Sequence, residues 1–423
     1  MPIPYRAARS PRSTAIAIFG GFLLLCLTAS APAEPLKLND VLLRAAGADM
    51  TAPVRTAAVG AAEAALRQAR IGPQPTIGVD LEDFAGSGPY SPARRAQSTF
   101  YYEQRWERGG KRDARTAVAR SEVGLTRQRA MLRALDMLSE VQIAWVEAQA
   151  AEAMARIADE RLQLARRLEA ETGRRVSRAL DPLFSAERAR AATALARVDH
   201  ERATAASRAA HAVLAAYLQI AAVDLDAADF VAPALAAPVD RAPDLALLEA
   251  EKDAAGQKVD LEKAQARTDP TVRAGVRHFG QGNDVAVIVG GSIPLGGQRA
   301  SRGNIERAEA ERRAAEAEIA VATAKRQREI DRLTADRAAI LRQIAGADAE
   351  VTPRAERAVR LVRDGFNRGG TAFTFLEVAE AQRAVIDARL RRIDLLRSYH
   401  LDGARLDRLT GRHLPLITSE ETR

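Results

Sequence analysis

The sequence predicts a mainly α-helical chain that also carries membrane β-strands, because it contains two copies of one helix–β-hairpin–helix unit. The copies, residues 38–220 and 243–411, each place short alternating stretches between long Ala- and Arg-rich helices. Before the strands the copies match at an offset of 195 residues, and after the strands at an offset of 187. The first hairpin is therefore eight residues longer. The matching landmarks are Ala69, Pro75, Thr76 and Gly110 in the first copy and Ala264, Pro270, Thr271 and Gly297 in the second.

Residues 1–33 have the three regions of a secretory signal peptide. Three arginines between positions 6 and 12 form a basic start, an apolar core runs from 15 to 28, and Ala31-Pro32-Ala33 offers a cleavage site. The only cysteine, Cys26, lies inside this segment. A lipid anchor there is the alternative, but Leu25 occupies the position where such an anchor needs a small residue. We expect cleavage after Ala33 and export of a chain without cysteine, disulfides or thiolate metal sites.

The composition favours long helices over several compact cores. Only 4% of the 423 residues are aromatic, and Ala, Arg, Glu and Leu dominate. Removing the three signal arginines from a formal charge of +8 leaves +5, carried by 60 basic and 55 acidic residues. Such a mixed-sign surface in an exported chain argues against nucleic acid as a partner, although an Arg-rich nucleic-acid-binding coiled coil is a third interpretation of the helices.

Each copy contains a very long helix and a returning one. From 113 to 172 there is no proline and one glycine, which predicts a rod of roughly 90 Å. It meets a turn at Gly173–Asp181 and returns over Leu183–Ile220. The second copy runs from 304 to 345, is interrupted between Gly346 and Pro353, resumes over 354–364, turns at 369–377 and returns over 375–409. Residues 221–242 are then a linker, and 412–423 a polar, disordered tail. A closed four-helix bundle is the alternative that the helices alone leave open.

The predicted hairpins, about 75–107 and about 270–293, alternate as membrane strands do. In Thr76–Glu82 the apolar residues Ile77, Val79 and Leu81 share one face. The other apolar sets are Phe100, Tyr102 and Trp106, then Val272, Ala274 and Val276, then Val285, Val287, Val289 and Ile293, with Ile288 as an exception. Alternating segments of this kind are typical of outer-membrane barrels. Tyr90, Tyr101, Tyr102 and Trp106 fit either an interfacial aromatic girdle or ordinary barrel packing.

Four strands cannot close a barrel, because open edges leave backbone groups unpaired in lipid. The chain must therefore oligomerise to complete the sheet. Three copies, giving twelve strands, are the economical way to enclose a water-filled pore.

The order of several motifs resembles the TolC-like family of outer-membrane efflux factors over nearly all of the exported chain. Leu-Glu-Asp-Phe-Ala-Gly at 81–86 precedes the first hairpin loop, Gly-Gly-Lys-Arg at 109–112 opens the first long helix, and Ser-Ile-Pro-Leu-Gly at 292–296 leads into the second. Phe-Leu-Glu-Val at 375–378 and Ala-Gln-Arg at 381–383 follow the second turn. The duplicated plan and the first two motifs are similar to the heavy-metal cation-efflux branch, such as the outer-membrane subunits of cobalt–zinc–cadmium exporters.

The resemblance implies a homotrimer with a twelve-stranded β-barrel in outer-membrane lipid of a Gram-negative bacterium and a long periplasmic α-helical barrel. The turns Gly173–Asp181 and Gly369–Glu377 would be periplasmic tips that dock an adaptor (membrane fusion) protein, itself joined to an inner-membrane RND pump. The expected docking residues are Gly173, Val176, Ser177, Gly369, Gly370 and Thr371. Glu377 and Glu380 match the positions of an acidic ring at the tunnel gate, and their spacing of three puts both on one helix face. A solvated helix face paired with Arg383 is the alternative.

Both tips are longer than the family pattern, with seven residues between the glycine and the acidic residue, so Phe373 or Phe375 could supply an apolar constriction instead. The implied function is a passive exit duct for heavy-metal cations. A drug or solvent exporter and a type I secretion channel are alternatives within the class, and a periplasmic coiled-coil scaffold or adaptor is the alternative from another class.

The sequence gives no indication of an enzyme, a cofactor or a metal site. The histidines have no i, i+4 metal-binding pair, and the Gly-rich stretches near 290 and 296 lack the Gly-Lys-Ser/Thr ending of a phosphate loop. The five histidines are His200, His211, His278, His400 and His413.

Overall fold

The computed structural model describes residues 35–90, 95–233, 241–367 and 375–418, all within one unit that spans Pro35–Arg423. The predicted signal peptide, residues 1–33, lies outside the described residues. Within the described ranges, no helix is both long and apolar enough to cross a membrane.

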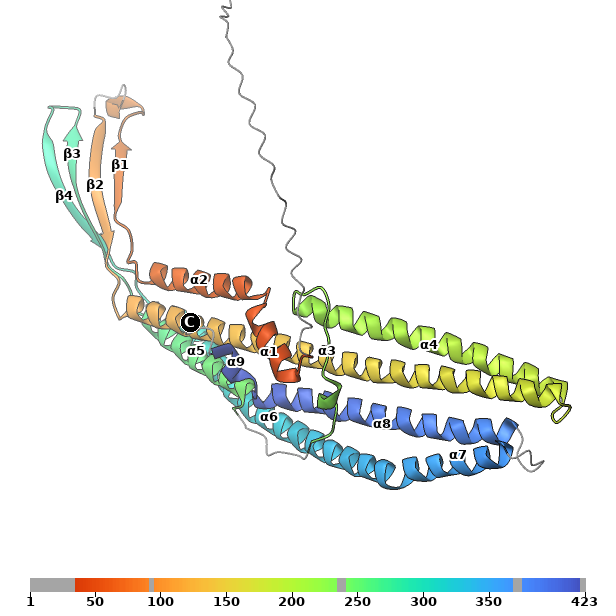
Figure 1. Cartoon of the computed structure of the whole chain (residues 1–423). Coiled ribbons are helices and arrows are strands. Elements are labelled where there is room, and N and C mark those ends of the chain that lie inside the picture. Colours follow the sequence, from red (N-terminus) through yellow and green to blue (C-terminus); the bar gives the residue numbers. More distant parts are fainter. Residues whose placement is uncertain (1–34, 91–94, 234–240, 368–374, 419–423) are drawn as a thin grey trace, which may run out of the picture. The chain divides into compact units, whose positions relative to one another are not determined.

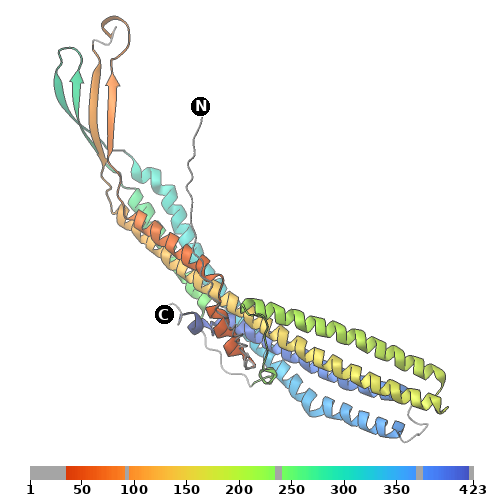
Figure 2. The same cartoon turned by 45° about the horizontal axis from the view of Figure 1, so that its top comes forward.

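The helices follow the predicted duplication (Figures 1 and 2). The first repeat contains α1 (Leu38–Gly47), α2 (Ala52–Ala69), α3 (Lys111–Ser177) and α4 (Leu183–Tyr217). The second contains α5 (Pro243–Gln265), α6 (Gly297–Gly346), α7 (Thr352–Asn367) and α8 (Phe375–Thr410), and α9 (Leu414–Thr418) follows it. The long helices of both repeats begin in the same way, after Gly110 (φ 73°) and Gly296 (φ 82°), because a left-handed backbone at this position favours glycine.

The two long helices differ from the prediction at their far ends. α3 continues through Gly173 to Ser177, so its 67 residues span about 100 Å and the turn before Leu183 is shorter than the expected Gly173–Asp181. In the second repeat, the expected interruption is a π-helical turn, Ala347–Val351, and the helix continues directly as α7. A wider turn accommodates the ring and missing N–H of Pro353 without ending the helix.

The core lies where the two repeats meet. α3 packs against α4, α5 and α8, and α6 packs against α5 and α8. Trp145 of α3 and Tyr399 of α8 are its largest buried side chains, each no more than 1% exposed. The linker is fixed to this core at Pro233, since the Tyr399 hydroxyl donates to the carbonyl of Pro233 at 2.6 Å. Asp226 likewise accepts at its carbonyl from the Gln149 amide at 2.9 Å.

The segment after α8 corrects the prediction of a disordered tail over 412–423. Residues 414–418 form α9, which contacts α1 and α3, and Leu416 and Ile417 pack against the core. His413 contacts the amide oxygen of Gln142 at 3.2 Å. The segment is polar on average, so its few apolar residues were overlooked in the sequence. Burying them against the end of the core is favourable because it removes apolar surface from water. Residues 419–423 lie outside the described residues.

One antiparallel sheet joins the two repeats. It has the order β1 (Thr76–Glu82), β2 (Gln97–Arg105), β3 (Thr271–Phe279) and β4 (Val285–Ser292), so that the two hairpins meet at β2 and β3. A short 3₁₀ turn, Gly88–Tyr90, lies in the longer first loop. Beyond β2, the amide of Trp106 donates to the carbonyl of Pro270 at 2.9 Å and extends the pairing.

Candidate functional site

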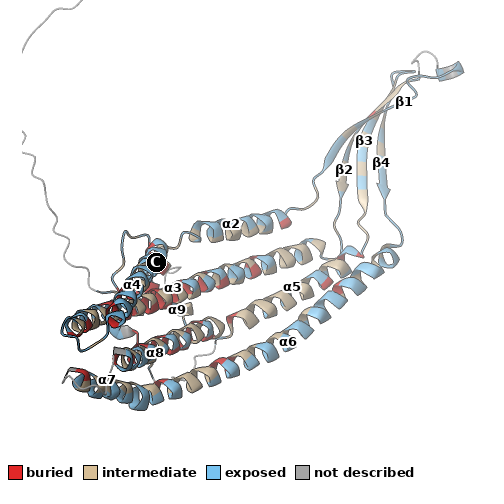
Figure 3. Cartoon of the chain, turned by 90° about the vertical axis from the view of Figure 1, so that its right-hand side faces the viewer, coloured by how far each residue is buried: buried red, intermediate tan, exposed pale blue. Residues whose placement is uncertain are grey.

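The sheet has one face that is mainly apolar and exposed, with Ser98, Gln104 and His278 as its polar members. Register places Ile77 opposite Tyr102, Phe100 opposite Val276, and Val276 opposite Val287. Ile77 is 81% exposed and Val287 79% exposed, and Figure 3 shows β4 mainly as exposed. We call this surface the apolar face; it comprises Ile77, Val79, Leu81, Phe100, Tyr102, Val272, Ala274, Val276, Val285, Val287 and Val289. A continuous apolar surface of this kind marks contact with lipid or with another protein.

The opposite surface, the polar face, carries charged residues in register. Arg273 of β3 pairs with Asp80 of β1 across the intervening strand. Arg277 reaches Glu82 at 2.5 Å and donates to the hydroxyl of Thr99 at 2.9 Å and the amide oxygen of Gln97 at 3.0 Å. The face therefore satisfies both arginines of β3 internally, and its polarity suits water.

A row of Gly78, Tyr101, Gly275 and Ile288 crosses the polar face. The Tyr101 ring covers Gly78, and the Cα and Cβ of Tyr101 lie against Gly275. The guanidinium of Arg273 stacks on the ring, with 3.2 Å between its carbon and the ring centroid. A side chain at Gly275 would put its Cβ 2.5 Å from the carbonyl oxygen of Phe100. The apparent exception Ile288 is thus a polar-face residue opposite a glycine. Tyr101 points away from Tyr102, so the four aromatic residues of the first hairpin do not form a single girdle.

The sheet is incomplete at both sides. Among the described strands, β1 and β4 each have one neighbour only. Their outer backbone groups have no partner strand within the described part of the chain. Because strands alternate in direction, the edge of β4 can accept a β1 strand from another copy in the same antiparallel mode.

The junction between sheet and helices is held by charged residues of both repeats. Lys111, in the first turn of α3, pairs with Asp269 at 2.8 Å. Burial alone would raise the pKa of the Asp269 carboxyl, but hydrogen bonds from the Lys111 ammonium and from the backbone of Arg108 lower it below its usual value. Glu107 pairs with Arg115 at 2.7 Å on the same junction. The Gly-Gly-Lys-Arg motif therefore fixes α3 to the sheet.

At the other end of α3, a buried arginine joins the tips of the two repeats. Arg175 is 8% exposed and donates to both carboxylate oxygens of Asp181, at 2.9 and 3.1 Å. It also donates to the carbonyl of Phe366 in α7 at 3.0 Å and stacks on that ring at 4.3 Å. The hydrogen bond with Asp181 raises the pKa of the Arg175 guanidinium, although burial opposes it, so the group is charged. Sequence reasoning missed Arg175, because its partner Phe366 lies 191 residues away.

The predicted docking residues of the first tip belong to the last turn of α3. Gly173 and Ser177 are exposed, Val176 is half-buried, and the Ser177 hydroxyl donates to the carbonyl of Arg174 at 2.8 Å. The predicted residues of the second tip, Gly369, Gly370, Thr371 and Phe373, lie outside the described residues.

The two predicted gate carboxylates, Glu377 and Glu380, lie in the first turns of α8 and are both exposed. Val378 between them is 2% exposed and faces the bundle. The alternative interpretation was a solvated helix face on which the glutamates pair with Arg383. In the structure, Arg383 forms an ion pair with Asp387 at 3.6 Å. Both carboxylates are therefore accessible from solvent at the start of α8.

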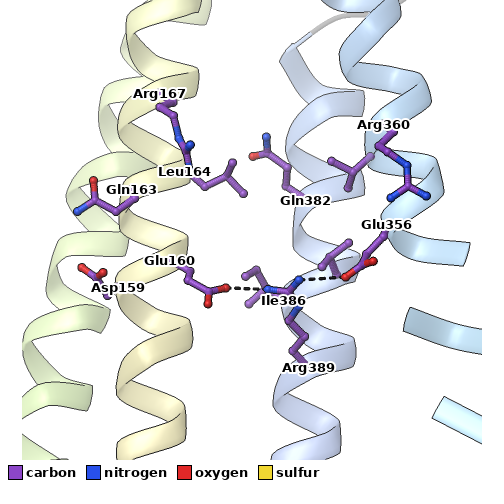
Figure 4. Close-up of a pocket in the computed structure, with 12 residues that line it drawn as sticks. Asp159, Glu160, Gln163, Leu164, Arg167, Glu356, Arg360, Gln382, Ile386 and Arg389 are labelled. Carbon is purple, nitrogen blue, oxygen red and sulfur yellow. Dashed lines mark hydrogen bonds and ion pairs between the residues drawn. The ribbon is translucent and has the colours of Figure 1, made fainter. Parts of the chain in front are cut away.

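A cavity of about 500 Å³ lies between α3, α7 and α8, behind this region (Figure 4). Arg389 crosses it and pairs with Glu160 of α3 at 2.7 Å and Glu356 of α7 at 3.0 Å. The cavity is lined by both charge signs and is open to solvent. Within the described residues, no group of three or more His, Cys, Asp or Glu side chains is placed to hold a metal ion.

The sequence is similar to two metal-resistance proteins. Nickel-cobalt-cadmium resistance protein NccC from Alcaligenes xylosoxydans xylosoxydans is 29% identical over 302 residues, which cover 69% of each chain. Cobalt-zinc-cadmium resistance protein CzcC from Cupriavidus metallidurans is 26% identical over 395 residues, 90% of this chain and 91% of that one. No protein-family model matches the chain.

The fold is similar to that of solved channel proteins. The structure of CusC, described in terms of transmembrane channel formation, superposes with a TM-score of 0.73 at 16% identity and covers 89% of this chain and 92% of that one. The outer membrane protein VceC from Vibrio cholerae gives 0.69 at 20% identity and covers 88% and 96%. The outer-membrane channel OprN gives 0.71 at 15% identity and covers 88% and 89%.

The chain therefore has the fold of the TolC-like outer-membrane channels, as the sequence predicts. The predicted resemblance to the heavy-metal cation-efflux branch is confirmed, because NccC and CzcC, to which the sequence is similar, are both named for metal resistance. The relatives are named as resistance proteins and channels, and none of those above is named as an enzyme.

Proposed function

We propose that this chain is the outer-membrane channel of a tripartite efflux system, a passive duct through which heavy-metal cations leave the cell. One observation carries the proposal: a sheet with an exposed apolar face, a polar reverse face and two open edges continues directly into helices about 100 Å long. The sheet lies in the outer membrane, and the helices extend into the periplasm. A periplasmic scaffold or adaptor would need no apolar sheet face.

The duct is a homotrimer in this proposal. Four strands from each of three chains give twelve, and β4 of one copy pairs with β1 of the next. This closure satisfies the open backbone edges and turns every apolar face toward lipid.

Cysteine cross-linking tests the closure. In a Cys26→Ser background, we expect Val79→Cys in β1 with Val287→Cys in β4 to give a ladder that ends at three chains when membranes are treated with a short thiol cross-linker. The matched control is Phe100→Cys with Val276→Cys, which are opposite each other in the central strands and should give no ladder. A ladder that ends at two chains, or none at all, contradicts the trimer.

The partners in this proposal are a periplasmic adaptor at the tips and an inner-membrane RND pump that supplies the energy. The resemblance of the sequence to metal-resistance proteins supports them. Docking is proposed at Gly173, Val176 and Ser177 of the first tip and at Gly369, Gly370 and Thr371 of the second. Of the first set, Gly173 and Ser177 are exposed to such a partner. Replacing Ser177 by Trp should lower cross-linking to the periplasmic adaptor without loss of the trimer, and unchanged cross-linking contradicts the docking assignment.

Glu377 and Glu380 form the proposed acidic ring at the gate, with Phe373 as a neighbouring apolar constriction. The exposed position of both carboxylates supports this role. Rings of carboxylates attract cations into a pore. Replacing both by Ala should lower the block of the reconstituted pore by divalent cations, and unchanged single-channel behaviour contradicts the gate role. Replacing Asp387, an exposed acid of the same helix that pairs with Arg383, is the control.

The substrate is tested by deletion and growth on a panel of salts and drugs. We expect greater sensitivity to divalent cobalt, zinc, cadmium or nickel. Sensitivity to organic compounds alone contradicts the cation assignment and identifies a drug or solvent duct instead.

A further inference from the structure

The charges of the polar face are balanced in number, and two of its three arginines form ion pairs on the face. The face holds the three carboxylates Asp80, Glu82 and Glu103 and the three guanidinium groups Arg105, Arg273 and Arg277. Two of the arginines come from β3, and the two carboxylates that they contact come from β1. β2 lies between these strands, so each arginine extends sideways over a neighbouring strand to reach its partner.

These contacts hold the guanidinium groups of both β3 arginines against the polar face. Arg273 lies on the Tyr101 ring and pairs with Asp80. Arg277 is held by Glu82 and by two neutral acceptors of β2, Thr99 and Gln97. An arginine with several fixed partners cannot project across a lumen as a free cation, and its charge is offset within a few ångströms.

We propose that the polar face is a charge-balanced lining that makes the membrane part of the duct permissive for cations, with Asp80 and Glu82 as the residues that set this property. Without them, Arg273 and Arg277 of every copy would form positive rings, and such rings select for anions and oppose cation exit. This inference rests on the proposed function, because only a closed barrel turns the polar face into a lumen.

The effect is large enough to measure. In water, one uncompensated unit charge about 10 Å away changes the local concentration of a monovalent ion about twofold, and more for a divalent ion. Salt screens this effect, with a Debye length of about 30 Å at 0.01 M and about 10 Å at 0.1 M. Selectivity should therefore respond most clearly at low ionic strength.

The experiment compares two double variants of the full-length protein in planar bilayers under a KCl gradient. Asp80→Asn with Glu82→Gln should shift the reversal potential toward anion selectivity, with at least an approximately twofold change in the K⁺ to Cl⁻ permeability ratio. Arg273→Gln with Arg277→Gln should shift it in the opposite direction. Arg273→Lys with Arg277→Lys keeps the charge and should leave it unchanged. With Zn²⁺ as the charge carrier, the carboxylate variant should conduct less than wild type.

A second pair of variants guards against loss of assembly. Ala286 lies on the polar face opposite Arg277, and adding Glu or Lys there changes the charge of the lining while Asp80, Glu82, Arg273 and Arg277 are all retained. Ala286→Glu should shift selectivity toward cations and Ala286→Lys toward anions. Conducting trimers whose reversal potential is the same in all these variants overturn the lining proposal. A wild-type protein that inserts into no bilayer and conducts no ions overturns the proposed function itself, which is a different result.

Discussion

Because Arg175 is buried and joins the tips of the two repeats, replacing it should destabilise the turn that follows α3. Arg175→Met keeps most of the length of the side chain but removes its charge, two hydrogen bonds to Asp181 and one to the carbonyl of Phe366. The two side chains of the ion pair are 9% and 12% exposed. Removing one partner of a buried pair costs about 3–5 kcal/mol, because the other charge remains buried without compensation. We expect the lower value, about 3 kcal/mol, since the turn can relax toward solvent.

Hydrogen–deuterium exchange of the detergent-solubilised protein measures this loss. The reporters are the amides of Arg178, Ala179 and Leu180, which donate to carbonyls of the last turn of α3. A loss of about 3 kcal/mol in the free energy of local opening should speed their exchange about 100-fold.

The neighbouring residue provides a matched control. Arg174 is exposed and pairs with Glu171 one turn earlier on the helix surface. Exposed pairs of this kind contribute about 0.5 kcal/mol or less, so Arg174→Met should change exchange about twofold at most. If the two variants exchange at the same rate, the joining of the tips by Arg175 does not stabilise them, and the reasoning from burial is refuted.

Three further predictions concern the sheet and the end of the chain. Val287→Asp on the apolar face should lower the yield of the membrane-inserted form, because a charged side chain facing lipid costs up to a few kcal/mol per copy. Ala286→Asp on the polar face should leave this yield unchanged. Equal yields of the two variants in outer-membrane fractions contradict the assignment of faces. Gly275→Val should abolish sheet assembly, because its Cβ meets a backbone carbonyl, and heat-resistant oligomer on a gel would contradict this. Burial alone would raise the pKa of the Asp407 carboxyl, but the His413 imidazole, 3.7 Å away, and a hydrogen bond from the Gln142 amide lower it. A carboxyl whose pKa is lowered on folding stabilises the folded state above its ordinary pKa, and this stabilisation is lost as the pH falls through the folded-state pKa. Protease cleavage around α9 should therefore increase only below about pH 4. Cleavage that rises already at pH 6 contradicts the prediction.

The local pattern of the sequence was sufficient for the strands, for their faces and for the starts of the returning helices α4 and α8. Alternation with period two placed Ile77, Val79 and Leu81 on the same face of the first strand, and the same alternation in the other strands predicted one apolar face for the whole sheet. The absence of proline and the near absence of glycine predicted the long first helix, because these residues are the ones that interrupt a helix locally. The duplication then predicted the same order of helices and strands in both repeats.

The contacts that hold the candidate site together depended on the tertiary structure. Arg175 meets Phe366 and Arg273 meets Asp80 only because packing and strand register bring distant segments together, and no local pattern encodes such a distance. The helical end of α3 beyond Gly173 and the folding of Leu416 onto the core have the same origin, since tertiary contacts outweigh the weak preferences of a glycine or a polar tail. Local periodicity therefore determined which elements form and which side each presents, whereas side-chain pairing between the repeats was decided by the free energy of packing them against each other.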